Sequence, residues 1–179
     1  MKKFRKKKGS GIIHVLTGTG GGKTTSALGV ALRSVGHQKS VVVIQFMKGR
    51  RDIGEYKAQR FLRPYFKIIQ FGTEDFINLK KPAKEDKINA QKALDFTRYT
   101  LNKKPDLLVL DELNLALKIK LVSINEVMEI LCNIPKKTTV YITGRYAPKQ
   151  IIDIADFVTK ITNIKEPKRL PKPRKGIEF

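Results

Sequence analysis

Ile12-Ile-His-Val-Leu-Thr-Gly-Thr-Gly-Gly-Gly-Lys-Thr-Thr25 is the stretch that decides the fold of this 179-residue chain. Its first six residues form a short apolar run, rich in β-branched side chains, of the kind that becomes a strand buried on both faces. Four glycines follow, and beyond Lys23 apolar residues recur at helical spacing until Gly36. The segment therefore predicts a strand, a tight glycine loop and a helix, in that order.

A loop of this composition can wrap a phosphate chain. Residues without a Cβ let backbone N–H groups turn inward, and the N-terminus of the next helix favours negative charge. Lys23 adds a positive charge, and the Thr24 hydroxyl could reach a Mg²⁺ ion that bridges phosphate oxygens. The usual signature has glycine where this chain has Thr17, and Gly18 comes one residue later. A glycine-rich turn without a ligand is the alternative, but the strand and helix on either side favour the phosphate loop.

The rest of the chain alternates between strand and helix patterns. Further strands are expected at 40–46, 66–71, 107–110 and 138–143, with a final segment at 157–164. Further helices are expected at 54–62, after Pro82 with an apolar stripe ending at Leu101, from a capping box at Ser123–Glu126 to about Leu131, and at 149–155. This alternation predicts an α/β fold, a mostly parallel sheet flanked by helices, of the RecA-like P-loop nucleotide-binding type. Ligands should bind at the carboxyl ends of the strands.

Polar residues at other strand ends complete the predicted site. Asp111 and Glu112 follow the apolar run Leu107–Leu110, where a carboxylate could hold Mg²⁺ directly or through water. Many strands end in an acid that only caps the next helix, so the pair gains its meaning from the glycine loop. The candidate ligand is Asp111 or Glu112, with no choice made between them. Gln45 and Arg145 end two other strands, where either could contact a nucleotide or serve only loop hydrogen bonds.

Composition bounds the remaining possibilities. With 41% hydrophobic residues the chain can bury a core, and its one cysteine and two histidines cannot form a disulfide framework or a Cys/His zinc cage. Because no apolar run is long enough to span a membrane and no secretory signal is evident, we expect a cytoplasmic protein. The net charge of +21 raises nucleic acid as a partner, but about half of the excess lies in basic tails. We interpret residues 1–10 and 165–179 as mobile, solvated tails around a domain at 11–164, and expect neither nucleic acid nor a membrane as a partner.

Blocks of sequence along the chain resemble one known family. The blocks are Thr17–Thr25, Val35-Gly-His37, Val43-Ile-Gln-Phe-Met-Lys-Gly49, Val109-Leu-Asp-Glu-Leu-Asn114, Ile142-Thr-Gly-Arg145 and Lys175-Gly-Ile-Glu-Phe179. Together they look like the P-loop type of ATP:corrinoid adenosyltransferase, which acts on cob(I)alamin or cob(I)yrinic acid a,c-diamide. The resemblance runs from about residue 11 to the C-terminus, and the late Gly18 is this family's own form of the loop.

The resemblance implies transfer of the 5′-deoxyadenosyl group of ATP to the Co(I) centre of a reduced corrinoid, with tripolyphosphate leaving, in cobalamin biosynthesis or salvage. Carried over by position, the ATP-binding residues are Gly18, Thr19, Gly20, Gly21, Gly22, Lys23, Thr24 and Thr25, to which we add Arg145 from its strand end. Lys23 and Thr24 are then the catalytic candidates, and Thr24, Asp111 and Glu112 are the candidate ligands of Mg²⁺. The family also suggests a homodimer and an electron-donor protein as partners.

Two positions depart from the family pattern. Gly21 stands where the family usually has a second lysine, so that phosphate contact is missing or comes from another base. The family uses an aromatic segment after the third strand to displace the lower ligand of the corrinoid. This chain has no tryptophan and offers only Phe71 and Phe76 there, for which packing in the core or a loop is the alternative role.

Two other functions compete with the transferase. One is a RecA-like P-loop ATPase acting on or with nucleic acid, suggested by the basic tails and by Glu112 as a base for water. The other is a small-molecule kinase, which usually needs an arginine-rich lid that the sequence does not show.

Overall fold

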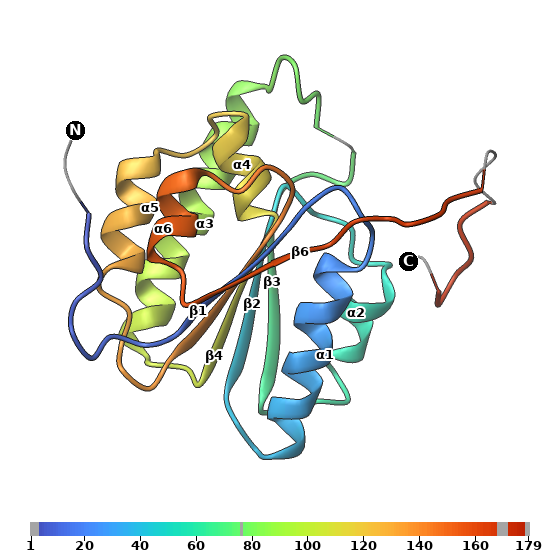
Figure 1. The fold of residues 1–179 in the computed structure, drawn as a ribbon. Helices are drawn as coiled ribbons and strands as arrows, with labels where there is room; N and C mark the ends of the chain where they lie inside the picture. The colour runs from blue at the N-terminus through green and yellow to red at the C-terminus, as the bar shows by residue number, and fades with distance from the viewer. Residues whose placement is uncertain (1–3, 76, 168–171, 178–179) are drawn as a thin grey trace.

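The computed structural model describes residues 4–75, 77–167 and 172–177 (Figure 1). Within these residues the strands are β1 (Ile13–Thr17), β2 (Val41–Phe46), β3 (Phe66–Phe71), β4 (Leu107–Asp111), β5 (Thr139–Thr143) and β6 (Phe157–Lys160). They form one sheet in the order β3-β2-β4-β5-β1-β6, and every pairing is parallel. The predicted strands and the parallel sheet are confirmed.

Helices cover both faces of the sheet (Figure 1). One face carries α1 (Lys23–Gly36) and α2 (Gly54–Ala58), and the other carries α3 (Lys84–Asn102), α4 (Leu113–Lys118), α5 (Ile124–Leu131) and α6 (Lys149–Ile154). Each face has its own apolar core: Ala27 and Ala31 belong to the α1 side, and Ala93 and Leu94 to the α3 side. Each large side chain buried in these cores contributes about 1.5 to 3 kcal/mol to folding. This three-layer arrangement confirms the predicted α/β fold.

Alternation along β2 and β4 decides which side chains face α1. Val43 and Val109 belong to the core on the α1 side, whereas Leu110 belongs to the core on the α3 side. Because successive side chains of a strand point to opposite faces, Gln45 and Asp111 return to the α1 side. The β2–β4 register pairs these two residues directly. The ends of both strands therefore point polar groups toward the start of α1, where the glycine loop lies.

The capping box predicted at Ser123 is wrong. Ser123 is the N-cap residue of α5, but its side chain makes no capping hydrogen bond. Glu126 instead accepts hydrogen bonds from Gln91 and Arg98 of α3. An ionic partner on a neighbouring helix has drawn this carboxylate away from the helix end, since hydrogen bonds with a charged partner are the stronger ones.

Two short helices differ from the prediction. Helix α2 ends at Ala58, and turns rather than helix continue to Leu62. Helix α4, Leu113–Lys118, was not predicted, because six residues are too few to show a helical period. This helix follows Glu112 directly, so it fixes how the second acid of the pair leaves the sheet.

The tail boundaries stay predictions, although the described part of the N-terminal tail contacts the domain. Phe4 packs against the core on the α3 side, Lys6 forms an ion pair with Asp156, and the Lys7 N–H donates to the carbonyl of Cys132. At the other end, the chain beyond β6 leads away from the sheet (Figure 1). None of the described helices combines the length and the hydrophobicity that crossing a bilayer would require.

Candidate nucleotide-binding site

The glycine loop bridges β1 and α1, and its shape requires glycine at two positions. Gly18 and Gly22 have φ values of +103° and +96°, in the left-handed region that side chains with a Cβ rarely adopt. A Cβ on Gly18 would also lie 2.2 Å from the carbonyl oxygen of Ile161. The late glycine of the loop is therefore needed so that the segment after β6 can pass close to the loop.

A cavity of about 240 Å³ lies above the loop. Its lining residues are Gly20, Gly21, Gly22, Lys23, Thr24, Thr25, Glu112, Leu115 and Arg145. The structure thus brings together most of the predicted site, including Arg145 from the end of β5. Gly18 and Thr19 do not line this cavity, and Asp111 lies beneath it.

Lys23 is buried at the start of α1, with only 7% of its surface exposed. Its ammonium donates a hydrogen bond to the carbonyl oxygen of Gly20 within the same loop. Burial lowers the pKa of Lys23 below its ordinary value, and the nearby Arg145 adds to this, while the charge of Glu112 acts in the opposite direction. An anion in the cavity would relieve that cost, since a negative charge favours the protonated ammonium.

Asp111 is fully buried and accepts four side-chain hydrogen bonds. Thr24 and Thr143 donate to Oδ1 at 2.8 and 2.6 Å, and Gln45 and Lys48 donate to Oδ2 at 3.1 and 2.8 Å. Burial by itself would raise the pKa of this carboxyl, but the charge and hydrogen bond of Lys48, together with the two hydroxyls, hold it below its ordinary value. A carboxylate has about four acceptor positions, so the partners within the chain already occupy them all.

Lys48 is a functional candidate that the sequence analysis missed. Its ammonium pairs with Asp111, and its side chain is 30% exposed. Burial would lower the pKa of Lys48, but Asp111 outweighs burial and raises it, with a smaller contribution from Glu112. The signal for this residue was its place in the polar stretch that leaves β2, at the same edge as Gln45.

Glu112 contrasts with Asp111 beside it. Its backbone has φ +63°, an unusual value for a residue with a side chain, and its N–H donates to the Thr143 hydroxyl. Its Oε2 atom is buried without a hydrogen-bond partner in the described part of the chain. Burial raises the pKa of Glu112, and so does the charge of Asp111, although Lys48 and other nearby cations oppose the rise. Glu112 is therefore the carboxylate of the pair with an uncommitted oxygen at the cavity.

The position of the family's second lysine has room for a side chain. A Cβ on Gly21 would meet no atom within 4 Å, and the Gly21 N–H donates to Oδ1 of Asn163 at 3.2 Å. Asn163 comes from the segment after β6, and the sequence analysis did not single it out. Lys48 is held by Asp111, so Arg145, which lines the cavity, is the other base placed for a phosphate contact.

The aromatic candidates receive only partial placement. Phe71 ends β3 and packs against Phe96 of α3, with ring centroids 5.6 Å apart, at the margin of the core on the α3 side. This position is consistent with the packing alternative. Phe76 lies outside the described residues. An aromatic contact with a corrinoid therefore stays a prediction for both.

The fold and the loop together define a P-loop nucleotide-binding protein of RecA-like architecture. A KaiC-like protein from the archaeon Pyrococcus horikoshii OT3 has a similar structure, with a TM-score of 0.54 and 18% identity, covering 88% of this chain and 74% of that one. Identity this low supports the fold alone.

Sequence comparison narrows the class to a family. Residues 9–179 match the family described as ATP:corrinoid adenosyltransferase BtuR/CobO/CobP. Corrinoid adenosyltransferases of a Sinorhizobium species and of Salmonella typhimurium are 33% and 35% identical, covering 94% and 87% of this chain and 80% and 78% of their own lengths. A third, from Pseudomonas aeruginosa, is 34% identical and covers 94% of this chain and 84% of its own. The chain therefore belongs to the ATP:corrinoid adenosyltransferase family, a family of enzymes.

Proposed function

We propose that this enzyme transfers the 5′-deoxyadenosyl group of ATP to the Co(I) centre of a reduced corrinoid and releases tripolyphosphate. The observation that carries this proposal is the loop cavity, where Lys23 and Arg145 converge on a space lined by backbone N–H groups at the start of α1. Such a cavity suits a polyanion that is held rather than cleaved. The family match over most of the chain supports the same reaction.

The proposed chemistry asks little of the protein beyond positioning and charge. Co(I) is the nucleophile: its electron pair forms the bond to C5′, the C5′–O bond breaks, and the bonding electrons leave with the triphosphate oxygen. No side chain has to remove a proton. Lys23, Arg145 and the loop N–H groups would stabilise the charge that gathers on the leaving triphosphate, and aligning C5′ with the metal supplies the rest of the acceleration.

The residues at the loop fit a Mg²⁺ ion bound with the nucleotide, which would neutralise phosphate charge. Glu112 offers the unpartnered Oε2 and Thr24 offers a hydroxyl at the cavity, and both are the hard oxygen donors that Mg²⁺ prefers. Asp111, with its acceptor positions taken, would act by holding the Thr24 hydroxyl in place. We therefore favour Glu112 over Asp111 as the direct ligand. In the described residues no three His, Cys, Asp or Glu side chains gather as a metal site of their own.

A RecA-like ATPase remains the competing function, and one observation favours it. The pKa of Glu112 is raised by burial, which makes this carboxylate a stronger base for activating water than an exposed one. That role would give ADP and phosphate without any corrinoid.

Phosphorus NMR of a completed reaction separates the two functions. With MgATP and chemically reduced Co(I) corrinoid under anaerobic conditions, we expect tripolyphosphate and adenosylcorrinoid in equal amounts, and little turnover when corrinoid is omitted. ADP and inorganic phosphate as the main products, formed equally well without corrinoid, would remove the transferase proposal in favour of the ATPase. The homodimer, the electron-donor protein and the biosynthetic or salvage role stay predictions.

A further inference from the structure

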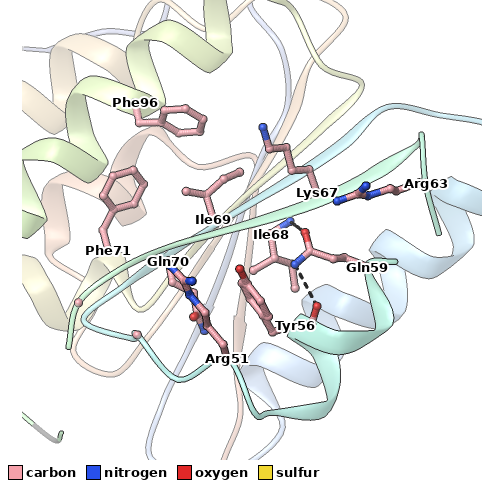
Figure 2. A pocket seen from close by; sticks show the side chains of 12 residues that line it. Arg51, Tyr56, Gln59, Arg63, Lys67, Ile68, Ile69, Gln70, Phe71 and Phe96 are labelled. Atoms are coloured by element: carbon pink, nitrogen blue, oxygen red, sulfur yellow. Dashed lines mark hydrogen bonds between the residues drawn. The ribbon is translucent and has the colours of Figure 1, made fainter. Parts of the chain in front are cut away.

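A second and larger cavity, of about 480 Å³, runs along the edge of the sheet at β3. We call it the edge groove. Its lining residues are Gly49, Arg51, Tyr56, Gln59, Arg63, Lys67, Ile68, Ile69, Gln70, Phe71, Gly72 and Phe96. Figure 2 shows Lys67, Ile69 and Phe71 on the side of β3 that faces Phe96, and Ile68 and Gln70 on the side of Tyr56. The groove therefore follows both faces of the edge strand.

The edge groove is rich in cations that lack acidic partners. Arg51, Arg63 and Lys67 line it, no carboxylate does, and none of the three forms an ion pair within the part of the chain that the structure describes. Other surface arginines behave differently: Arg50 pairs with Asp52, and Arg98 pairs with two acids. The potential in the groove is thus positive and is not cancelled locally, which favours an anionic ligand.

The remaining walls suit an organic ligand rather than an added strand. The side chain of Gln59 already accepts a hydrogen bond from the Ile68 N–H on the free edge of β3, which blocks part of that edge from pairing with another strand. Phe71 and Phe96 supply apolar surface. The Oε1 atom of Gln70 is buried and has no partner within the described residues, so it is ready to accept a hydrogen bond from an amide.

The edge groove is connected to the nucleotide site. Gln70 donates to Oε1 of Gln45 at 3.0 Å, and Gln45 donates to Asp111 at 3.1 Å. At the same end the loops after β2 and β3 touch: a Cβ on Gly49 would lie 2.5 Å from the Gly72 carbonyl oxygen. The groove thus begins at the carboxyl edge of the sheet, where ligands of parallel α/β folds bind, two hydrogen bonds away from Asp111.

We propose that the edge groove binds free carboxylate side chains of the corrinoid, and that the enzyme therefore favours corrinoids with acidic side chains over fully amidated ones. This inference rests on the proposed function. A corrinoid carries acetate- and propionate-type arms around its ring, either as acids or as amides. Arms that are acids would meet Arg51, Arg63 and Lys67, and an amide arm would donate to Gln70. The substrate class is thus a partly amidated corrinoid that reaches from the nucleotide cavity into the groove.

A binding experiment with two probes tests this selection. Cobyrinic acid a,c-diamide keeps free carboxylates, whereas cobinamide has all of its ring arms converted to amides. Both are used as Co(III) forms, which are not nucleophilic, in the presence of MgATP, so that equilibrium dialysis measures binding without turnover. We expect the acidic probe to bind the wild-type enzyme about tenfold more tightly, with a preference that weakens as salt is added.

A triple variant and a matched control locate the effect. Arg51→Gln, Arg63→Gln and Lys67→Gln together should remove the preference for the acidic probe and leave cobinamide binding within twofold of wild type. Lys103→Gln, Lys136→Gln and Lys137→Gln remove the same charge from exposed positions near the opposite edge of the sheet, and should retain the preference. Urea unfolding of both variants checks that the fold is intact.

The outcomes distinguish this inference from the proposed function. Equal binding of the two probes to the wild type, or an equal loss in the triple variant and the control, would overturn the edge groove as a selective site while the transferase stands. If neither probe binds and no adenosylcorrinoid forms from either Co(I) form, the proposed function fails and this inference fails with it.

Discussion

The Asp111 cluster and the edge groove treat charge in opposite ways, although two hydrogen bonds connect them. In the cluster a fully buried carboxylate has its ammonium, two hydroxyls and an amide in place before any ligand arrives. In the groove three exposed cations have no acidic partner among the described residues. Water solvates exposed charges at little cost, whereas a buried charge must be paired within the fold. The cluster is therefore built for stability and positioning, and the groove is available for a ligand.

Asp111→Asn should have the largest effect on stability. The variant leaves the mostly buried Lys48 without a counter-ion, and breaking a buried pair in this way costs about 3 kcal/mol or more. We expect the free energy of unfolding, measured by urea denaturation at pH 7, to fall by that amount. Asp52→Asn, which breaks the exposed pair with Arg50, is the matched control and should change stability by less than about 1 kcal/mol. Equal losses in the two variants would contradict the contrast between buried and exposed charge.

Lys23→Ala should weaken ATP binding without unfolding the protein. The ammonium lies within the loop rather than in the apolar core, and one charge-assisted contact with phosphate contributes roughly 1.5 to 3 kcal/mol. We expect calorimetry to show ATP affinity reduced by at least tenfold and adenosyl transfer to be lost, with the melting temperature little changed. Lys39→Ala, at an exposed position before β2, is the control and should bind ATP normally. An unchanged affinity in Lys23→Ala would refute the assignment of the site.

Glu112→Gln should have the smallest effect on stability, and one that depends on pH. The folded protein raises the pKa of Glu112 above its ordinary value of 4.5, so folding favours the protonated form. The contribution of Glu112 to stability is therefore full below about pH 4.5 and is lost as pH rises through the raised pKa. Gln mimics the neutral acid, so we expect the variant to be more stable than wild type at pH 7, by roughly 1 kcal/mol, with the difference vanishing near pH 4.

Two further measurements on Glu112→Gln sharpen the comparison with Asp111. The folded pKa of Asp111 is lowered, so its contribution has the opposite sign: it is present above its ordinary pKa of 3.8 and lost as the pH falls. Urea denaturation at pH 4 and pH 7 measures both slopes. The variant should also need more Mg²⁺ to bind ATP. A variant that is less stable than wild type at pH 7 would show that Glu112 is an ionised, satisfied carboxylate.

Local patterns in the sequence predicted much of the fold and the core of the site. The β-branched run before Thr17, the glycines before Lys23 and the apolar run before Asp111 each act over a few residues, so they can be recognised without neighbours. The prediction for Ser123 failed because its outcome depended on a competitor, Arg98, from another helix. Lys48 was missed for the same reason, since its partner lies across the sheet.

The sequence by itself determined the order of strands and helices, the phosphate loop and the presence of two adjacent acids, because backbone preference and side-chain chemistry are local properties. Only the tertiary structure decided how the acids divide their roles. The register of β2 beside β4 gives Asp111 to Gln45 and Lys48, while the left-handed backbone at Glu112 turns the next carboxylate to the cavity without a partner. The edge groove likewise depends on which strand lies at the rim of the sheet. Such properties arise between residues far apart in the chain, and the free energy of burial and pairing acts there only once the chain has folded.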